Sequence, residues 1–184
     1  MTPPRLAPLE APYDAELTEE LALFTPGVPP IALFRTLAHN PRVLRKFRLG
    51  SLLDRGSLSL RERELAILRT SWLCRSEYEW GVHVAYFAVR AGLSDEEVRA
   101  TCAPELPAGI FSAHDAVILR LCDSLHATAS VDDALYAELG RELSSAQIVE
   151  LLVLAGFYHT VAFATNALRI ELEPSAPRFP AGGP

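Results

Sequence analysis

Apolar residues recur along most of the chain every three or four positions, the spacing at which side chains share one face of an α-helix. No Asn-Gly or Asp-Gly turn separates alternating, strand-like runs. We therefore expect an all-α protein. The pattern predicts helices, with boundary errors of about two to four residues, over residues 14–24, 30–39, 41–53, 59–73, 76–92, 94–102, 112–128, 131–142 and 145–171.

Short polar residues mark several of these helix starts, because a side-chain oxygen can accept hydrogen bonds from the first free amides. Glu62 and Glu97 each follow a serine by three residues, which is the spacing of a capping box. Gly92 is expected to end the helix over 76–92, since glycine adopts the left-handed conformation without strain. The candidate N-caps are Ser59, Ser94, Ser112 and Ser144.

Proline is concentrated at the two ends of the chain, over residues 1–13 and 173–184. Such segments are typical of flexible tails. Residues 14–172 are long enough to form a single domain with its own core. The last helix is apolar on nearly all sides over 148–168, more than one small domain can cover, and this predicts an obligate homo-oligomer.

The same helix is the one segment that resembles a membrane span. Glu150, His159, Asn166 and Arg169 lie within 148–170, and ionisable groups there would be costly in lipid. A central helix buried in the domain or between subunits is the better interpretation. No membrane partner is expected.

Composition narrows the class of protein further. The formal net charge of -6 provides no basic surface for nucleic acid. No apolar run follows Arg5, so the N-terminus does not resemble a secretory signal, and we expect a cytoplasmic protein. Three widely spaced cysteines argue against a disulfide framework and against a four-thiolate zinc site.

Chemistry-bearing residues gather on one side of the predicted helix over 76–92. On a helical wheel the polar stripe lies beside an apolar stripe of Trp80, Val84, Phe87, Ala88 and Ala91. The polar stripe is equally compatible with an exposed, salt-bridged helix surface. It consists of Ser76, Glu79, His83, Tyr86 and Arg90.

A metal site is the first chemical alternative for this stripe. Glu79 and His83, four residues apart, could each donate one ligand. Two ligands are too few, and a third would have to come from Glu64 or from His159 across helices. We therefore expect neither a metal nor another cofactor, and interpret His159 as a hydrogen-bonded core residue.

One stretch carries a resemblance to a known family. Its marks are Arg-Glu-Arg-Glu-Leu at 61–65, Tyr-Glu-Trp at 78–80, His83, and Ala-Gly-Leu-Ser at 91–94. Residues 58–98 resemble the core of the carboxymuconolactone decarboxylase-like superfamily, which includes the alkyl hydroperoxidase D-like proteins. The resemblance extends more weakly over about 30–170. It implies a helical bundle that assembles as a dimer, a trimer or a trimer-based hexamer.

The peroxidase branch of this superfamily carries a Glu on one helix and Cys-x-x-Cys-x-x-x-His at the start of the next. Counting back from His83, its glutamate falls on Glu64, but its two cysteines fall on Ser76 and Glu79. One thiolate must attack the peroxide and a second must resolve the sulfenic acid, and neither is present here. Cys74 lies nine residues before His83, on about the opposite helix face. The pattern resembles the decarboxylase branch instead.

The decarboxylase branch removes carbon dioxide from a carboxylated unsaturated lactone without a cofactor. The resemblance implies that His83 is a general acid, that Glu64 orients it and that Glu79 belongs to the same catalytic group. Arg90 is a candidate to bind the charged end of a small-molecule substrate. The other candidate substrate contacts are Ser76, Tyr78, Trp80 and Tyr86, although aromatic residues at helical spacing such as Trp80 are more often core.

Three functions thus remain open at the level of sequence. The first is acid/base chemistry, by decarboxylation, lactone opening or isomerisation, on a small carboxylated or carbonyl-bearing molecule. The second is peroxide reduction, an antioxidant peroxiredoxin-like activity, through a single cysteine, Cys74. The third is a non-catalytic, oligomeric ligand-binding protein that has kept the fold.

Overall fold

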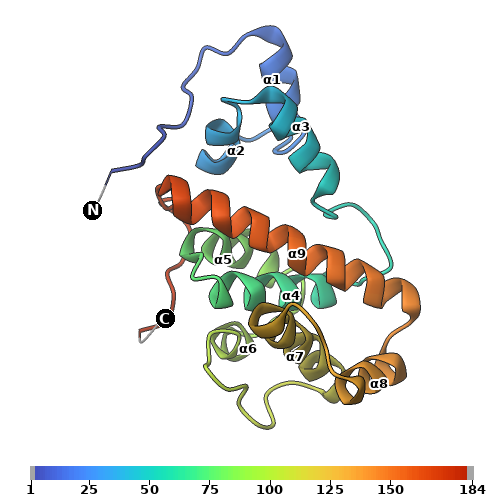
Figure 1. The fold of residues 1–184 in the computed structure, drawn as a ribbon. Coiled ribbons are helices and arrows are strands. Elements are labelled where there is room, and N and C mark those ends of the chain that lie inside the picture. Colours follow the sequence, from blue (N-terminus) through green and yellow to red (C-terminus); the bar gives the residue numbers. More distant parts are fainter. Residues whose placement is uncertain (1–2, 182–184) are drawn as a thin grey trace.

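The structure, a computed structural model, describes residues 3–181 and is all-helical over that range (Figure 1). A single π-helical turn, η1, follows the fifth α-helix. The elements are α1 (Ala15–Ala22), α2 (Ala32–Leu37), α3 (Pro41–Gly50), α4 (Leu60–Leu73), α5 (Glu77–His83), η1 (Val84–Ala88), α6 (Asp95–Ala100), α7 (Ala113–Thr128), α8 (Asp133–Glu142) and α9 (Ser145–Leu168).

The predicted helix starts are confirmed at the level of individual hydrogen bonds. Ser59 and Ser94 form complete capping boxes with Glu62 and Glu97. Ser112 accepts from the third amide of α7, and Ser144 forms a further capping box at the start of α9. Gly92 has a φ of 69°, as expected for the residue that ends this stretch of helix.

The prediction of one continuous α-helix over 76–92 is wrong in its second half. The α-helix ends at His83, and the next five residues, Val84–Ala88, form η1. A π-turn bonds i to i+5 and so accommodates one residue more per turn than the helical wheel assumes. Phe87, predicted on the apolar stripe, lies against His83, with ring centroids 5.1 Å apart.

Helix α9 lies at the centre of the fold. In Figure 1 it passes between the group α1–α3 and the helices α4, α5 and α7. Its principal contacts are with α4, which also packs against α7 and α5. On its other side, Phe157 of α9 packs against Phe47 of α3, with ring centroids 4.8 Å apart.

The ends of the chain are held more closely than the flexible tails that their proline content predicts. The backbone of Arg5 bonds to Leu168 at the end of α9, at 2.9 Å. At the other end, Glu173 accepts a hydrogen bond from the Tyr78 hydroxyl, at 2.7 Å. The N-terminal segment thus pairs with a free carbonyl at the end of α9, and the C-terminal segment accepts from a buried hydroxyl of α5. Residues 1, 2 and 182–184 lie outside the described range.

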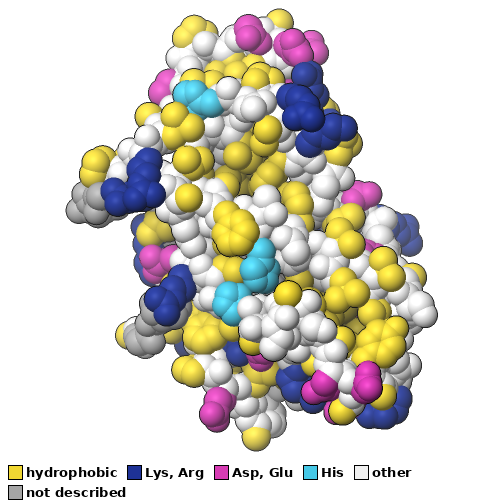
Figure 2. All heavy atoms as spheres, in the orientation of Figure 1, with side chains coloured by type: hydrophobic (Ala, Val, Ile, Leu, Met, Phe, Trp, Pro, Cys, Tyr) yellow, Lys and Arg dark blue, Asp and Glu magenta, His cyan; other side chains and the backbone are white. Residues whose placement is uncertain are grey.

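By length and composition alone, α9 could cross a membrane, and 44% of its most apolar window is buried within this structure. One side of α9 packs on α4, and apolar side chains on its other side remain exposed. The face of the molecule shown in Figure 2 carries many hydrophobic side chains. The exposed group is Val149, Leu152, Val153 and Phe163.

The homo-oligomer stays a prediction, supported by this exposed apolar group, because surfaces of this kind are commonly covered by a partner. Light scattering at micromolar concentration should give a mass of at least two chains. A stable monomer under those conditions would contradict it.

A pair of glycines tests how the C-terminal segment packs on α5. A Cβ at Gly81 would lie 2.4 Å from the backbone oxygen of Pro177, whereas nothing lies within 4 Å of a Cβ at Gly140 of α8. Gly81→Ala should therefore destabilise the fold by about 1–3 kcal/mol, while Gly140→Ala should stabilise it by up to about 1 kcal/mol. Urea unfolding of both variants measures the difference. Equal changes in the free energy of unfolding would mean that the C-terminal segment does not pack closely against α5.

Candidate active site

His83, the last residue of α5, is 3% exposed and is held through its inner nitrogen. Its Nδ1 lies 2.7 Å from Oε2 of Glu64, which is fully buried on α4. A carboxylate can only accept, so Nδ1 carries the hydrogen and donates it. The imidazole is thus oriented with its other nitrogen, Nε2, toward Glu79 and Tyr158.

Glu64 is itself fixed by a neighbour. Its second oxygen, Oε1, accepts from Nε of Arg63 at 3.2 Å. The same guanidinium donates to the backbone oxygen of Leu53 at 2.9 Å, which joins it to the segment before α4. Both oxygens of the buried carboxylate therefore have charged or protonated partners, as burial requires.

The outer nitrogen of His83 meets two polar side chains. Glu79, one turn earlier on α5, places Oε1 3.2 Å from Nε2. The hydroxyl of Tyr158 on α9 lies 3.1 Å from the same nitrogen. Tyr158 is not among the site residues predicted from the sequence, because one phenol in an apolar helix gives no signal of the side it faces.

One carboxylate oxygen of Glu79 is not used in hydrogen bonding within the described residues. The side chain is 7% exposed, and its Oε2 is buried with no hydrogen-bond partner among the residues that the structure describes. A buried carboxylate oxygen without a partner is costly. It is a group available to a ligand or to a proton.

The surroundings shift the proton affinity of two of these groups. Burial opposes the positive charge on His83, but the carboxylates of Glu64 and Glu79 outweigh it and raise the pKa of His83 to about 9. Burial, and then the same two carboxylates, hold the pKa of Tyr158 well above its ordinary value. At neutral pH the site contains an imidazolium and a neutral phenol.

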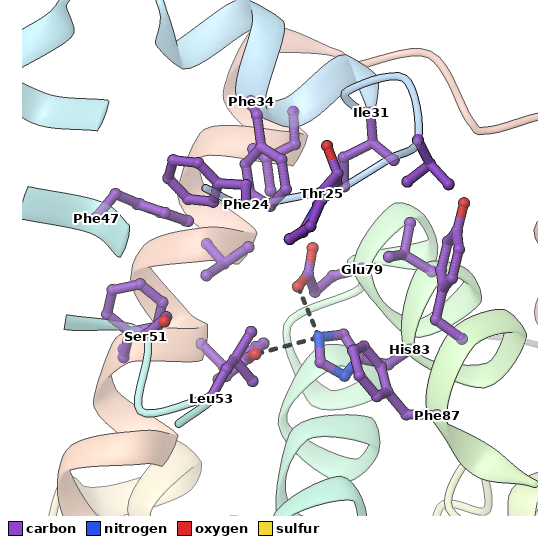
Figure 3. A pocket seen from close by; sticks show the side chains of 18 of the residues that line it. Phe24, Thr25, Ile31, Phe34, Phe47, Ser51, Leu53, Glu79, His83 and Phe87 are labelled. Carbon is purple, nitrogen blue, oxygen red and sulfur yellow. Dashed lines mark hydrogen bonds and ion pairs between the residues drawn. The ribbon is translucent and has the colours of Figure 1, made fainter. Parts of the chain in front are cut away.

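A cavity of about 320 Å³ opens over Glu79, His83 and Tyr158. Figure 3 shows Glu79 and His83 on one side of it, with aromatic side chains facing them from the segments around α1–α3. The walls are mainly apolar and aromatic, and Glu64 lies behind His83 rather than on the surface of the cavity. The aromatic lining includes Phe24, Phe34, Phe47, Phe87 and Phe157.

Two of the five predicted substrate contacts, Tyr86 and Arg90, line this cavity. The other three lie elsewhere. Ser76 is bonded to Thr165 at 2.8 Å, and the Tyr78 hydroxyl bonds to Glu173. Trp80 donates to Thr101 within the core, in agreement with the expectation that such aromatics are usually core.

None of the three cysteines lines the cavity, and all three are free. Burial raises the pKa of Cys74 to about 11 and those of Cys102 and Cys122 to about 12. Reactive thiols have a lowered pKa and stand beside a second thiol or a cation. The residues that line the cavity therefore include titratable groups, Glu79, His83 and Tyr158, but no thiol.

Comparison with known proteins gives a family match and several similar folds. Residues 39–119, which contain Glu64, Glu79 and His83, match the Carboxymuconolactone decarboxylase family. No curated protein matches the chain significantly by sequence.

Solved structures resemble the chain over most of its length. A peroxidase-related protein from Silicibacter sp. is 19% identical, with a TM-score of 0.75 over 98% of this chain and 100% of that one. An AhpD-core protein from Ralstonia eutropha is 15% identical, with a TM-score of 0.75 over 92% and 93%. The debrominase Bmp8, bound to 2,3,4-tribromopyrrole, is 14% identical, with a TM-score of 0.69 over 92% of each chain.

At these identities the similar structures establish the fold rather than an activity. The family match covers the segment that holds the buried Glu64–His83 pair, and the structural matches cover nearly all of the chain. Residues 39–119 are thus similar to the carboxymuconolactone decarboxylase family, and the chain has the fold of AhpD-like proteins over nearly all of its length.

Proposed function

We propose that the protein is a cofactor-independent enzyme that transfers protons to and from a small, carbonyl-bearing molecule with an unsaturated ring. The observation that carries this proposal is that His83 and Glu79 line one cavity in direct contact, and that Glu79 keeps a buried carboxylate oxygen with no partner among the described residues. A protonated imidazole and a carboxylate at one point form an acid and base pair.

Decarboxylation uses the acid. The bond between the ring carbon and the substrate carboxylate breaks, and its electron pair passes into the conjugated carbonyl to form a dienolate. Carbon dioxide leaves, and His83 gives its Nε2 proton to the dienolate carbon. Glu64 stabilises the imidazolium before this step, and water restores the proton afterwards.

Isomerisation uses the base as well. Glu79 removes a proton from a carbon next to the carbonyl, and the electron pair moves onto the carbonyl oxygen. The Tyr158 hydroxyl, which stays protonated, and the His83 Nε2–H can both donate to that oxygen. The proton then returns to a different atom, so that no other reactant is consumed.

The cavity favours a compact and mainly apolar substrate. A volume of about 320 Å³ lies at the small end of ligand cavities. Its aromatic walls suit a planar ring, and the relative Bmp8 was solved with 2,3,4-tribromopyrrole. Arg90 lines the cavity, is exposed, and has no ion-pair partner among the described residues, so it suits a substrate carboxylate.

The non-catalytic alternative has less support from this geometry. A surface salt bridge would be expected if Glu64 and His83 only stabilised the fold. Instead the pair is buried, and His83 lines a concave cavity. The substrate can be sought by mass identification of a small molecule that co-purifies with the protein, followed by a turnover assay with it.

Replacing His83 by Gln tests the acid. Glutamine can still bond to Glu64 but cannot supply a proton, so turnover should fall by roughly 10²–10⁴ while the protein still folds. Turnover can be followed as carbon dioxide release and as deuterium incorporation from heavy water. His39→Gln is the matched control, because His39 is exposed and bonds to the backbone of Ala7 outside the cavity. Full turnover by folded His83→Gln would remove this residue from the mechanism.

The pH dependence tests Glu64. With His83 as the acid and its pKa raised to about 9, activity should be high at neutral pH and fall as the pH rises through about 9. Glu64→Gln removes the charge that raises this pKa, so the fall should occur at lower pH. A pH–rate profile with its basic limb unchanged in Glu64→Gln would contradict the role of this carboxylate.

Peroxide reduction offers a direct contrast. Because no thiol lines the cavity, the purified protein should not accelerate the consumption of an alkyl hydroperoxide in the presence of a dithiol reductant. A peroxide-consumption assay against a buffer blank measures this. Catalysed, thiol-dependent consumption would favour the single-cysteine peroxidase instead.

A further inference from the structure

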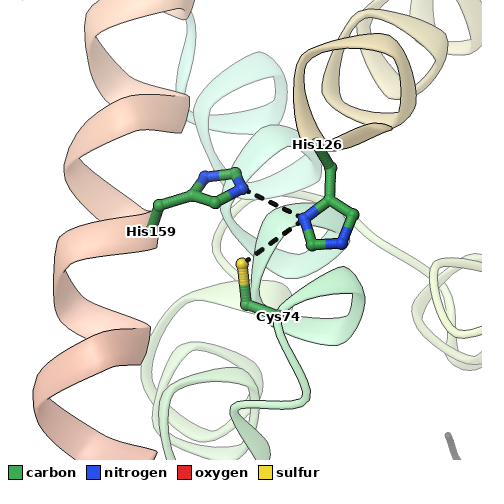
Figure 4. A group of neighbouring side chains, drawn as sticks. All are labelled: Cys74, His126 and His159. Atoms are coloured by element: carbon green, nitrogen blue, oxygen red, sulfur yellow. Dashed lines mark hydrogen bonds between the residues drawn. The ribbon is translucent and has the colours of Figure 1, made fainter. Parts of the chain in front are cut away.

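Cys74, His126 and His159 meet outside the cavity, at a point where three helices come together. Cys74 caps the end of α4, His126 lies near the end of α7, and His159 lies in the middle of α9. Figure 4 shows the three side chains converging from these separate elements. Their ligand atoms, one from each residue, all lie within 4.8 Å of one another.

We propose that these three residues form a binding site for a single divalent ion of the zinc type, with water as the fourth ligand. A thiolate and two imidazoles are ligands that Zn²⁺ takes in proteins. Zinc sites with three protein ligands commonly keep the fourth position for water. The site uses none of the residues of the proposed catalytic group.

The distances are close to those of a tetrahedral site. Bond lengths of about 2.3 Å to sulfur and about 2.0–2.1 Å to nitrogen imply ligand separations of roughly 3.5 Å for S···N and roughly 3.3 Å for N···N. The structure has 3.7 Å between Cys74 Sγ and His126 Nδ1, and 3.1 Å between His126 Nδ1 and His159 Nε2. The remaining pair, Cys74 and His159, lies within the 4.8 Å that separates all three ligand atoms.

The hydrogen bonding of His159 selects the nitrogen that faces the site. Its Nδ1 lies 2.8 Å from the backbone oxygen of Ala155. A carbonyl oxygen can only accept, so Nδ1 carries the hydrogen, and in the neutral ring Nε2 presents a lone pair. A carbonyl that holds the distal N–H of a histidine is the usual arrangement around metal-bound imidazoles.

Cys74 is also held in place by α9. The side-chain amide of Asn166 donates to the backbone oxygen of Cys74 at 2.8 Å. Asn166 follows His159 by seven residues, about two helical turns, so both lie on the same face of α9. The thiol is half-buried, and His126 is exposed, which leaves a path for an ion from solvent. Histidine side chains are visible at the surface near the middle of the face shown in Figure 2.

Cobalt provides the test, because Co²⁺ occupies zinc sites and reports its ligands by absorption. Titration of the full-length, reduced protein with Co²⁺ should saturate at one ion per chain. It should produce the visible bands of a tetrahedral site and a thiolate-to-cobalt charge-transfer band. Added Zn²⁺ should remove both sets of bands by displacement.

Variants of the ligands should lose this behaviour. Cys74→Ser should abolish the charge-transfer band, and His126→Asn should weaken Co²⁺ binding by at least about 10–100-fold, the loss that follows even from removing a partner beyond the ligands. His126 is exposed, so its replacement should leave the fold intact, as circular dichroism can verify. Cys102→Ser and His114→Gln are matched controls that should bind as the unaltered protein does.

Two results would overturn the proposal. One is the absence of a charge-transfer band in the unaltered protein, and the other is equal Co²⁺ binding by Cys74→Ser. The result is independent of the proposed catalytic function, because His83→Gln should keep the cobalt site unchanged.

Discussion

The burial of the pair formed by His83 and Glu64 is the constraint around which this fold is arranged. Removing two ionisable groups from water costs several kcal/mol for each ion unless their partners are well placed. The 2.7 Å contact between them requires α4 and α5 to pack in one register. Arg63 then compensates the carboxylate, and α9 brings Tyr158 to the imidazole. Helices α4, α5 and α9 therefore provide polar partners for the buried pair in addition to burying apolar surface.

The same arrangement gives the cavity its chemical character. Three of its ionisable groups, Glu79, His83 and Tyr158, meet at one point, and most of the remaining wall is aliphatic or aromatic. In such surroundings the effective dielectric constant is low and charge interactions are stronger than in water. The oxygen of Glu79 that has no partner among the described residues, and the Nε2 side of His83, therefore lie where a bound molecule would feel strong electrostatic interactions.

Local features of this protein could be predicted from the sequence, whereas contacts between distant residues could not. The serine caps follow from interactions within three residues, and Glu64 and His83 were found through a motif of fixed spacing. The π-turn depends on packing that a helical wheel ignores, and Tyr158 is 75 residues from the imidazole that it contacts. The neighbours of Cys74 could not be predicted for the same reason: His126 and His159 are 52 and 85 residues away in the sequence.

The cavity is assembled from segments inside and outside the residues that match the family, and α9 contributes to it as well. Glu79 and His83 lie within the residues that match the family, whereas the facing wall begins with Phe24 and Ile31, ahead of that match. A substitution in the wall changes shape and hydrophobicity without touching the proton-carrying groups. The shape of the cavity can therefore vary separately from the group formed by Glu79, His83 and Tyr158. The segment ahead of α3 is the part of the chain in which we expect substitutions to change ligand selectivity without disturbing that group.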